Sequence, residues 1–322
     1  MLRYVIKRLL ITIPIVVCVA VLIFTILYFT PGDPAEMILG SDATTEEVES
    51  FRTYLGIDRP YIVQLGDYLY KLFIKGELGE SWIYRTNIID EIQNRLPRTL
   101  AISMYSILLG AVCGIPLGVA AAVRQNSKFD KFVLFLSSAM HCIPSYVIAM
   151  VLIIVFSLHL GLLPSYGIGS LKHYILPCVC ILLTSFCGLA RSMRTSMLEV
   201  IRSDYVVAAR AQGFSRRRVI YGRALPNAMI PILTQLGAQF ATALGGTLIL
   251  ETIFSIPGMG LFIQGAITKR DRPIVLSAVV FLAIWFCLIM LVVDILYAVV
   301  DPRIRAQYEE QSGGRGRRRK KV

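Results

Sequence analysis

The sequence predicts an all-α membrane protein with six transmembrane helices. Of its 322 residues, 56% are hydrophobic and only 17% are charged, whereas soluble domains carry about 25% charged residues. Six apolar runs explain this composition, and each reaches or approaches the roughly 20 residues that a helix needs to cross a bilayer core. The runs are 9–29, 99–123, 132–157, 174–190, 228–250 and 274–300. Since these runs are long and do not alternate between apolar and polar residues, they exclude a β-barrel.

The placement of lysine and arginine predicts that both termini are cytoplasmic. With this orientation, 22 of the 33 basic residues lie on the cytoplasmic side, in the N-terminus, 124–131, 191–227 and 301–322. Cytoplasmic segments of membrane proteins carry such an excess. The first run has a basic start, but it is too long for a secretory signal and lacks a small-x-small cleavage site, so we expect a retained span. The net charge of +12 is then explained by orientation and by anionic lipid, without nucleic acid.

The predicted spans divide the chain into four parts. These are the N-terminus and first transmembrane helix (1–30), an extracytoplasmic loop (31–98), a five-helix permease-like core (99–300) with a cytoplasmic loop at 191–227, and a basic cytoplasmic tail (301–322). The extracytoplasmic loop holds 12 acidic and 7 basic residues. A loop of this length with its own punctuation is usually functional. It either docks an extracytoplasmic partner or shields the outer ends of the helices.

Within that loop, the segment 45–55 is expected to form a helix that Thr44 or Thr45 caps, because glutamates follow in its first turns. In the spans, Pro116 and Pro144 permit kinks where helices line a water-filled path. Glycines at 110, 114 and 118 fit such a path, and they fit ordinary helix packing through small residues equally well.

No motif for catalysis, nucleotide binding or metal binding is present. None of the nine lysines follows a glycine, which excludes a phosphate-binding P-loop. The three histidines, His141, His159 and His173, are too scattered to suggest a metal site. No side chains mark a nucleophile with an orienting base. We therefore expect a chain that is not an enzyme by itself and holds no cofactor.

Two ionisable residues in the predicted spans are candidates for a structural or a pathway role. Asp294 lies about seven residues before the end of the last run, or roughly 10 Å from that helix end. An acid at such a depth either forms a pair with a cytoplasmic arginine or marks a pathway. His141 precedes Pro144 and is either a packed polar residue at a kink or a proton relay. A proton-driven carrier would usually show more buried charge than this sequence has.

A short polar segment at 204–213 predicts a force-transmitting contact on the cytoplasmic face. We expect a helix over 205–212, which Asp204 caps and Gly213 ends in the left-handed conformation. So short a helix is marginal in water and needs something packed on it. Small alanines let the surface of another protein approach closely. The residues expected at this contact are Asp204, Tyr205, Ala208, Ala209, Arg210, Ala211 and Gly213, with Leu225 and Pro226 further along the chain.

The same segment resembles the cytoplasmic signature of ABC importer permeases, which runs Glu-Ala-Ala, three residues, Gly, nine residues, Ile-x-Leu-Pro. Ala208, Ala209 and Gly213, followed by Leu225-Pro226, fall on this spacing, while Val207 replaces the glutamate and Arg223 the isoleucine. The segment Asp-Tyr-Val-x-x-Ala-Arg-Ala-x-Gly resembles the dipeptide/oligopeptide/nickel branch. Further matches cover nearly the whole chain and include Gly32-Asp33-Pro34, Gly76-Glu77-Leu78-Gly79, Glu251-x-x-Phe254-Ser255-x-Pro257-Gly258-x-Gly260 and Asp301-Pro302-Arg303.

Within that branch the chain resembles the DppB/OppB-type subunit, and the resemblance implies a type I ABC importer permease fold in the bacterial cytoplasmic membrane. It implies four kinds of partner: a second homologous permease, two ABC ATPase subunits that bind ATP and Mg²⁺, an extracytoplasmic substrate-binding protein and membrane lipid. It further implies that the helix at 205–212 docks on an ATPase and couples its motion to import of di- or oligopeptides. Import of nickel or a nickel chelate is the alternative cargo. A stand-alone secondary carrier and a non-transporting scaffold are the alternatives in class.

Overall fold

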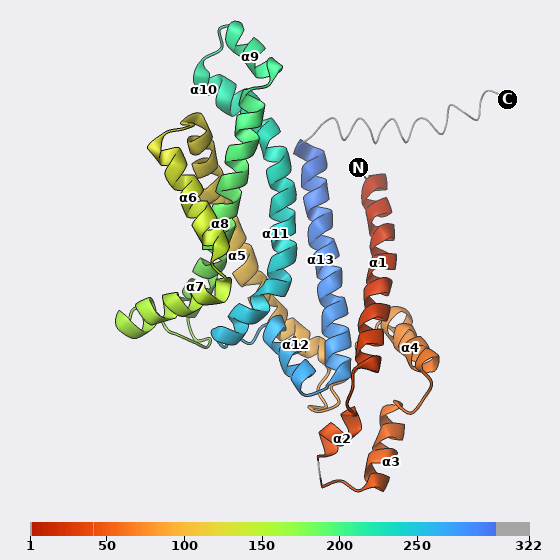
Figure 1. The fold of residues 1–322 in the computed structure, drawn as a ribbon. Coiled ribbons are helices and arrows are strands. Elements are labelled where there is room, and N and C mark those ends of the chain that lie inside the picture. The colour runs from red at the N-terminus through yellow and green to blue at the C-terminus, as the bar shows by residue number, and fades with distance from the viewer. Residues whose placement is uncertain (1, 41, 301–322) are drawn as a thin grey trace, which may run out of the picture.

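The computed structural model describes residues 2–40 and 42–300 as a bundle of long helices with shorter helices at its two ends (Figure 1). The long helices are α1 (Leu2–Phe29), α5 (Ile88–Val123), α6 (Lys128–Cys142), α8 (Lys172–Ile201), α11 (Leu225–Ile253) and α13 (Arg272–Val300). The shorter ones are α2 (Pro34–Leu39), α3 (Thr45–Leu55), α4 (Tyr61–Tyr70), α7 (Ser145–Leu152), α9 (Asp204–Ala211), α10 (Arg216–Val219) and α12 (Met259–Thr268). Wider π-helical segments η1 (Lys71–Lys75), η2 (Ile153–His159) and η3 (Ile220–Ala224) continue α4, α7 and α10. The predicted basic tail at 301–322 lies outside the described residues.

Each predicted apolar run coincides with helix. In the described part of the chain, α1 from Arg8, α5, α8 and α13 up to Ile295 are each long and apolar enough to cross a membrane. The pair formed by α6 and α7–η2 would make a fifth crossing, and α11 covers the run at 228–250. Because α5 begins at Ile88, the predicted boundary between residues 98 and 99 falls inside a helix. The total of six crossings stays a prediction.

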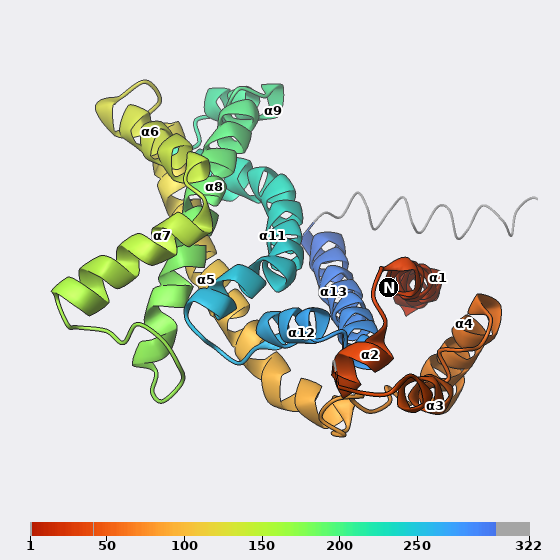
Figure 2. The same cartoon turned by 60° about the horizontal axis from the view of Figure 1, so that its bottom comes forward.

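At the third run the structure differs from the single span expected at 132–157. Helix α6 ends at Cys142 and α7 begins at Ser145, and their axes are bent by 98°. Ile143 is extended (φ −90°, ψ 120°), because the ring of Pro144 disfavours the helical conformation in the residue before it. Proline was expected to kink this run. The result is a complete break that directs α7 and η2 sideways out of the bundle (Figures 1 and 2).

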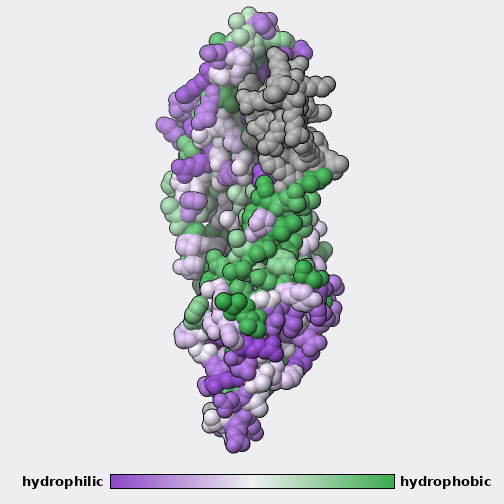
Figure 3. Space-filling view, turned by 90° about the vertical axis from the view of Figure 1, so that its right-hand side faces the viewer, coloured by the Kyte–Doolittle hydropathy of each residue, from purple (hydrophilic) through white to green (hydrophobic). Residues whose placement is uncertain are grey.

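The two ends of the bundle carry different elements. Figure 1 places the start of α1 and the short helices α9 and α10 at one end, and α2, α3 and α12 at the opposite end. The face in Figure 3 shows an apolar band over its middle that gives way to hydrophilic residues below. This is the arrangement expected if the N-terminus and α9 share the cytoplasmic side.

Small residues let α5 and α8 pack in close contact. A Cβ atom added at Gly110 would lie 2.9 Å from Ser185 Oγ, and one at Gly114 would lie 2.7 Å from the backbone oxygen of Phe186. Real Cβ contacts are longer, so these positions exclude any side chain. Of the two interpretations of the glycines, helix packing through small residues is confirmed.

The outer segment 31–98 does not stand apart from the membrane-facing bundle. Its α4 packs against α1, where the ring of Tyr68 stacks on Phe24 with centroids 5.5 Å apart. Leu69 and Leu72 pack near the buried residues Val16 and Ala20 in the middle of the first predicted span. Part of this loop therefore lies along α1 at the depth of the predicted bilayer.

Helix α3 begins as expected. Thr44 is its N-cap: the backbone N–H of Glu47 donates to Thr44 Oγ1 at 3.3 Å, and the backbone N–H of Thr44 donates to Glu47 Oε2 at 2.8 Å. This reciprocal pair is a capping box, which decides between Thr44 and Thr45. The two hydrogen bonds from Thr44 lower the pKa of the Glu47 carboxyl.

Candidate functional site

Helix α9, which is predicted to be cytoplasmic, spans Asp204–Ala211, one residue earlier than expected at both ends. The predicted cap at Asp204 is wrong. Ser203 holds the N-cap position, and its hydroxyl donates to the backbone oxygen of Val200 (2.6 Å) instead of accepting from the helix. Asp204 is the first helical residue, where its negative charge favours the positive end of the helix dipole.

The left-handed glycine that stops α9 is as predicted. Gly213 has φ of +83°, in the left-handed region that glycine adopts without strain. The backbone N–H of Gly213 donates to Arg210 (3.0 Å), and that of Phe214 donates to Ala209 (3.4 Å). These two bonds form a Schellman motif, which satisfies the last carbonyl groups of the helix and turns the chain sharply towards α10.

One face of α9 packs on the chain itself. Val206 and Ala209 are 0% and 7% exposed, and they join a buried cluster with Val219, Ile220 and Ala224. Ala209 was expected on the face that meets a partner, and the structure places it on the opposite face. Positions 206 and 209 are one helical turn apart, so both side chains point towards η3.

The free face of α9 is formed by Asp204, Val207, Ala208 and Ala211, all of which are exposed. Their spacing of three and four residues places them on one stripe, opposite the buried pair. Small side chains and one exposed valine make this stripe a flat surface of low conformational entropy. The cytoplasmic end of the bundle thus presents a short, supported helix with an unpartnered face.

Polar contacts tie this end rigidly to three long helices. Asn227 donates to the hydroxyl of Tyr205 (2.7 Å), and the buried hydroxyl of Ser196 donates to the backbone oxygen of Ala228 (2.9 Å). Arg216 donates to the backbone oxygen of Val123 at the end of α5 (3.3 Å). The first bond joins α9 directly to α11, the second joins α11 to α8, and the third joins α10, which follows α9, to α5.

The predicted residues after α9 have distinct places. Leu225 is partly buried against the same cluster, whereas Pro226 is exposed in the first turn of α11. Arg223, which replaces the isoleucine of the family signature, lies over the ring of Phe214 at 5.7 Å, and Arg218 lies over it at 5.1 Å. Arg210, also exposed, adds to this positive surface beside α9.

Two open cavities lie along the facing sides of α8 and α11. The outer one, about 310 Å³, is lined by Thr184, Gln239 and Thr242 among others, and His141 contributes to its wall. The inner one, about 350 Å³, is lined by Thr195, Glu199 and Pro231. Gln235 lines both, so the cavities adjoin each other. Their lining residues recur every three to four positions on both helices and form one polar stripe along the bundle.

The two ionisable candidates have separate environments. Arg8 of α1 and Asp294 of α13 form a bidentate ion pair. The distances are 3.1 Å from Arg8 Nε to Asp294 Oδ2 and 3.2 Å from Arg8 Nη2 to Asp294 Oδ1. The predicted pairing of Asp294 with an arginine is therefore confirmed. Asp294 lines neither cavity of the polar stripe, whereas His141 lines the outer one.

Sequence analysis missed a buried carboxylate at the outer end of α11. Glu251 is 1% exposed; Thr99 donates to its Oε1 (2.6 Å) and the backbone N–H of Leu261 to its Oε2 (3.1 Å). Gly258 lies so close to this carboxylate that a Cβ atom there would overlap it. Glu251 thereby holds the start of α12 against α5. The available signal was an acid directly after an apolar run.

A second missed carboxylate, Asp271, joins the two outer loops. It is fully buried and accepts from Ser81 Oγ (2.5 Å) and from the backbone N–H groups of Trp82 and Ile83 (both 3.3 Å).

At the predicted cytoplasmic end, Asp130 (1% exposed) forms an ion pair with Arg194 that joins α6 to α8. Neither Asp271 nor Asp130 was assigned a role from the sequence.

The predicted outer docking region is built on ion pairs. Arg52 of α3 bonds to Asp33, which caps α2, and to Glu36 at 3.1 Å. The carboxylate of Asp33 raises the pKa of the Arg52 guanidinium. These bonds fix α2 and α3 to each other at the outer tip in Figure 1.

Comparison with known proteins covers nearly the whole chain. Residues 114–306 match the family model described as "Binding-protein-dependent transport system inner membrane component", and residues 1–103 match its N-terminal counterpart. The "Glutathione transport system permease protein GsiC" of Escherichia coli O6:H1 is 38% identical over 305 residues, covering 95% of this chain and 99% of the relative. Its counterpart in Salmonella typhimurium is 37% identical over the same length and coverage.

The fold has a solved neighbour as well. A chain of the MetNI methionine ABC transporter in an inward-facing conformation matches with a TM-score of 0.57 and 21% identity, covering 66% of this chain and 98% of that one. The likeness supports the type I ABC importer permease fold. The family match over 114–306 and the 38% identity to GsiC show that the chain belongs to the inner-membrane permease components of binding-protein-dependent ABC importers.

Proposed function

We propose that this permease subunit moves di- or oligopeptides through the polar stripe between α8 and α11. Membership in the family makes it a multi-pass protein of the bacterial inner membrane, and a non-catalytic subunit whose ATP hydrolysis is done by partner ATPases. The lining of the outer cavity is the observation that favours a peptide as the cargo. It consists largely of hydroxyl and amide side chains, and Ser185 donates to Gln239 within it at 2.6 Å.

Such a lining suits a peptide in transit. Hydroxyl and amide groups both donate and accept, so they can exchange hydrogen bonds with a moving peptide backbone without trapping it by charge. The described residues that line the outer cavity carry no acid, lysine or arginine, whereas one charge of each sign, Arg191 and Glu199, lines the inner one. The related GsiC proteins are named for glutathione, a tripeptide, which supports cargo of this size for the present chain.

Uptake by the importer reconstituted in proteoliposomes tests this cargo. We expect ATP-dependent uptake of a labelled tripeptide that unlabelled di- and tripeptides inhibit and that nickel salts leave unchanged. Nickel-dependent uptake that peptides do not inhibit would contradict the peptide assignment and favour the nickel alternative. Among the described residues, no group of three or more His, Cys, Asp or Glu side chains could hold a metal ion, which favours peptide.

We further propose that the free face of α9 docks on an ATPase subunit. The support is mechanical: Val206 and Ala209 pack α9 on the buried cluster, Asn227 of α11 bonds to Tyr205 of α9, and Arg216 of the adjoining α10 bonds to the end of α5. A partner that moves α9 would then shift the helices that line the polar stripe. The roles of Asp204, Ala208 and Ala211 follow from their place on this face.

The complete importer is proposed to contain a second homologous permease, two ATPases and a substrate-binding protein that docks at the outer tip around α2 and α3. Purification of this chain in mild detergent, followed by identification of the co-purifying proteins, tests the composition. We expect a second permease of similar length and P-loop ATPases. Recovery of the chain alone, or only with itself, would contradict the proposed assembly.

A further inference from the structure

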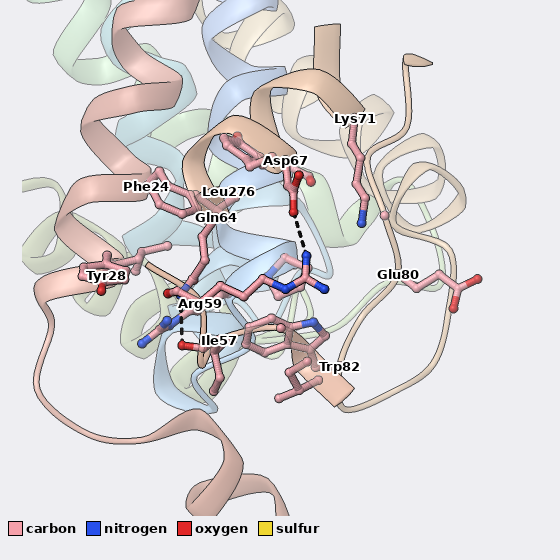
Figure 4. Close-up of a pocket in the computed structure, with 18 of the residues that line it drawn as sticks. Phe24, Tyr28, Ile57, Arg59, Gln64, Asp67, Lys71, Glu80, Trp82 and Leu276 are labelled. Atoms are coloured by element: carbon pink, nitrogen blue, oxygen red, sulfur yellow. Dashed lines mark hydrogen bonds and ion pairs between the residues drawn. The ribbon is translucent and has the colours of Figure 1, made fainter. Parts of the chain in front are cut away.

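A separate cavity of about 380 Å³ lies at the outer ends of α1 and α13, away from the polar stripe (Figure 4). Phe24 and Tyr28 of α1 form one wall, Leu276 of α13 a second, and Trp82 a third. Ligand sites in proteins are commonly of this size, with aromatic walls and a few polar groups. The mechanism proposed above makes no use of it.

Two polar groups of this cavity have no partner among the described residues. Arg272 is the first residue of α13, and its half-buried guanidinium forms neither a hydrogen bond nor an ion pair with the described residues. The carboxylate of Asp33 is in electrostatic contact with Arg272, but it already forms an ion pair with Arg52. The hydroxyl of Tyr68 is buried and likewise unpaired. A buried donor without an acceptor costs about 1–3 kcal/mol. Both donors would be satisfied by an anionic oxygen.

The other charges place the positive centre inside and negative groups at the rim. Arg59 crosses the cavity to pair with Asp67 at 3.0 Å, as Figure 4 shows, so these two charges are neutralised. Glu77, Glu80 and Lys71 also line the cavity and are exposed, so this outer group carries two negative charges and one positive charge. A half-buried arginine with a net negative outer group matches a zwitterion whose anionic end enters first.

The helix that flanks the cavity has the form of a membrane-surface element. On α4–η1, Gln64, Asp67 and Lys71 line the cavity, one helical turn apart. A second face exposes apolar side chains: Ile62 is 78% exposed and Ile74 71%. Water-facing loops rarely expose such residues, whereas helices in the headgroup region of a bilayer do so regularly.

We propose that this cavity binds a zwitterionic aminophospholipid of the outer leaflet. Its phosphate accepts from Arg272 and from Tyr68, its ammonium group faces Glu77 and Glu80, and its acyl chains lie along the apolar side of α1 and α4. A lipid fits better than a peptide because the walls are the last turns of one predicted span and the first turns of another. The aromatic rings of Tyr28 and Trp82 fit the membrane interface, where such rings are enriched.

Native mass spectrometry of the delipidated importer, titrated with short-chain phosphatidylethanolamine, tests the proposal. We expect one lipid per copy of this chain, bound at least threefold more tightly than phosphatidylglycerol of the same chain length. Since a charge-assisted hydrogen bond is lost, Arg272→Ala should weaken binding about tenfold or more. Tyr68→Phe removes only the hydroxyl and keeps the ring, so it should fold normally and weaken binding about threefold.

Lys172→Ala is the control, because Lys172 is an exposed basic residue at the start of α8 that does not line the cavity. It should leave lipid binding unchanged. The proposal is overturned if the wild-type chain retains no lipid, or if Arg272→Ala and Tyr68→Phe both bind like the wild type. Displacement of the lipid by millimolar inorganic phosphate or by a tripeptide would also overturn it, since the ligand would then be free phosphate or cargo.

Discussion

Removal of Arg194 should destabilise the protein far more than a surface ion pair would suggest. Asp130 is 1% exposed and Arg194 has a side-chain exposure of 15%, with a second bond between Arg194 Nη2 and Asp130 Oδ2 of 2.7 Å. In Arg194→Ala the carboxylate of Asp130 keeps the backbone N–H of Asn126 (2.9 Å) but loses its countercharge. Breaking a buried pair on one side costs about 3–5 kcal/mol. We expect a loss of unfolding free energy in that range.

A double-mutant cycle separates this penalty from the net contribution of the pair. The single variants Asp130→Asn and Arg194→Ala are compared with their combination, which removes both charges, and replacing both charges of a buried pair is often close to neutral. We therefore expect the double variant to recover most of the stability that Arg194→Ala loses. The assay is denaturant unfolding in mixed micelles, read by circular dichroism, with the exposed pair Arg59–Asp67 as control, where removal should cost at most about 1 kcal/mol. A loss below about 1 kcal/mol for Arg194→Ala would refute the reasoning.

Three further predictions concern packing, the α1–α13 ion pair and the path. Gly118→Ala places a Cβ 2.7 Å from that of Met193 and should lower the melting temperature by several degrees. The control Gly265→Ala has open space around it and should leave the melting temperature unchanged. Equal melting temperatures for the two variants would contradict the close α5–α8 packing. Asp294→Asn weakens the bidentate contact with Arg8 and should lower stability and assembly yield while the uptake KM stays unchanged, so a KM effect with normal assembly would indicate a pathway role. Gln239→Leu should slow peptide uptake about tenfold, because an apolar side chain in the path leaves a passing polar group unpaired at about 1–2 kcal/mol, and unchanged uptake would exclude this lining.

The sequence predicted the helices well because apolar runs and glycine stops are local signals. The end of α9 at Gly213 and the capping box at Thr44 depend only on neighbouring residues, and both are confirmed. The position of the interruption at Ile143–Pro144 was predicted, but the angle between the two helices was not. Proline prevents a continuous helix, whereas the 98° angle depends on how α7 packs on distant elements.

The site was predicted less completely, because its key contacts join residues far apart in the chain. Periodicity within eight residues did not show that Ala209 faces η3 and Ala208 faces outward, since that depends on where α10 and η3 fold back. The buried carboxylates Glu251 and Asp271 gain their partners 152 and 190 residues away. From sequence alone, an acid beside an apolar run reads as a loop residue unless its partner is known.

The free face of α9 is proposed to carry the motion of an ATPase to the transport path. The direct test is the importer purified with Ala208→Glu, whose exposed position should leave the chain folded and the second permease bound. We predict that the ATPase subunits are lost or bound at least tenfold more weakly, and that peptide uptake falls with them. If Ala208→Glu keeps its ATPases and transports peptide at the wild-type rate, the free face of α9 does not couple the two.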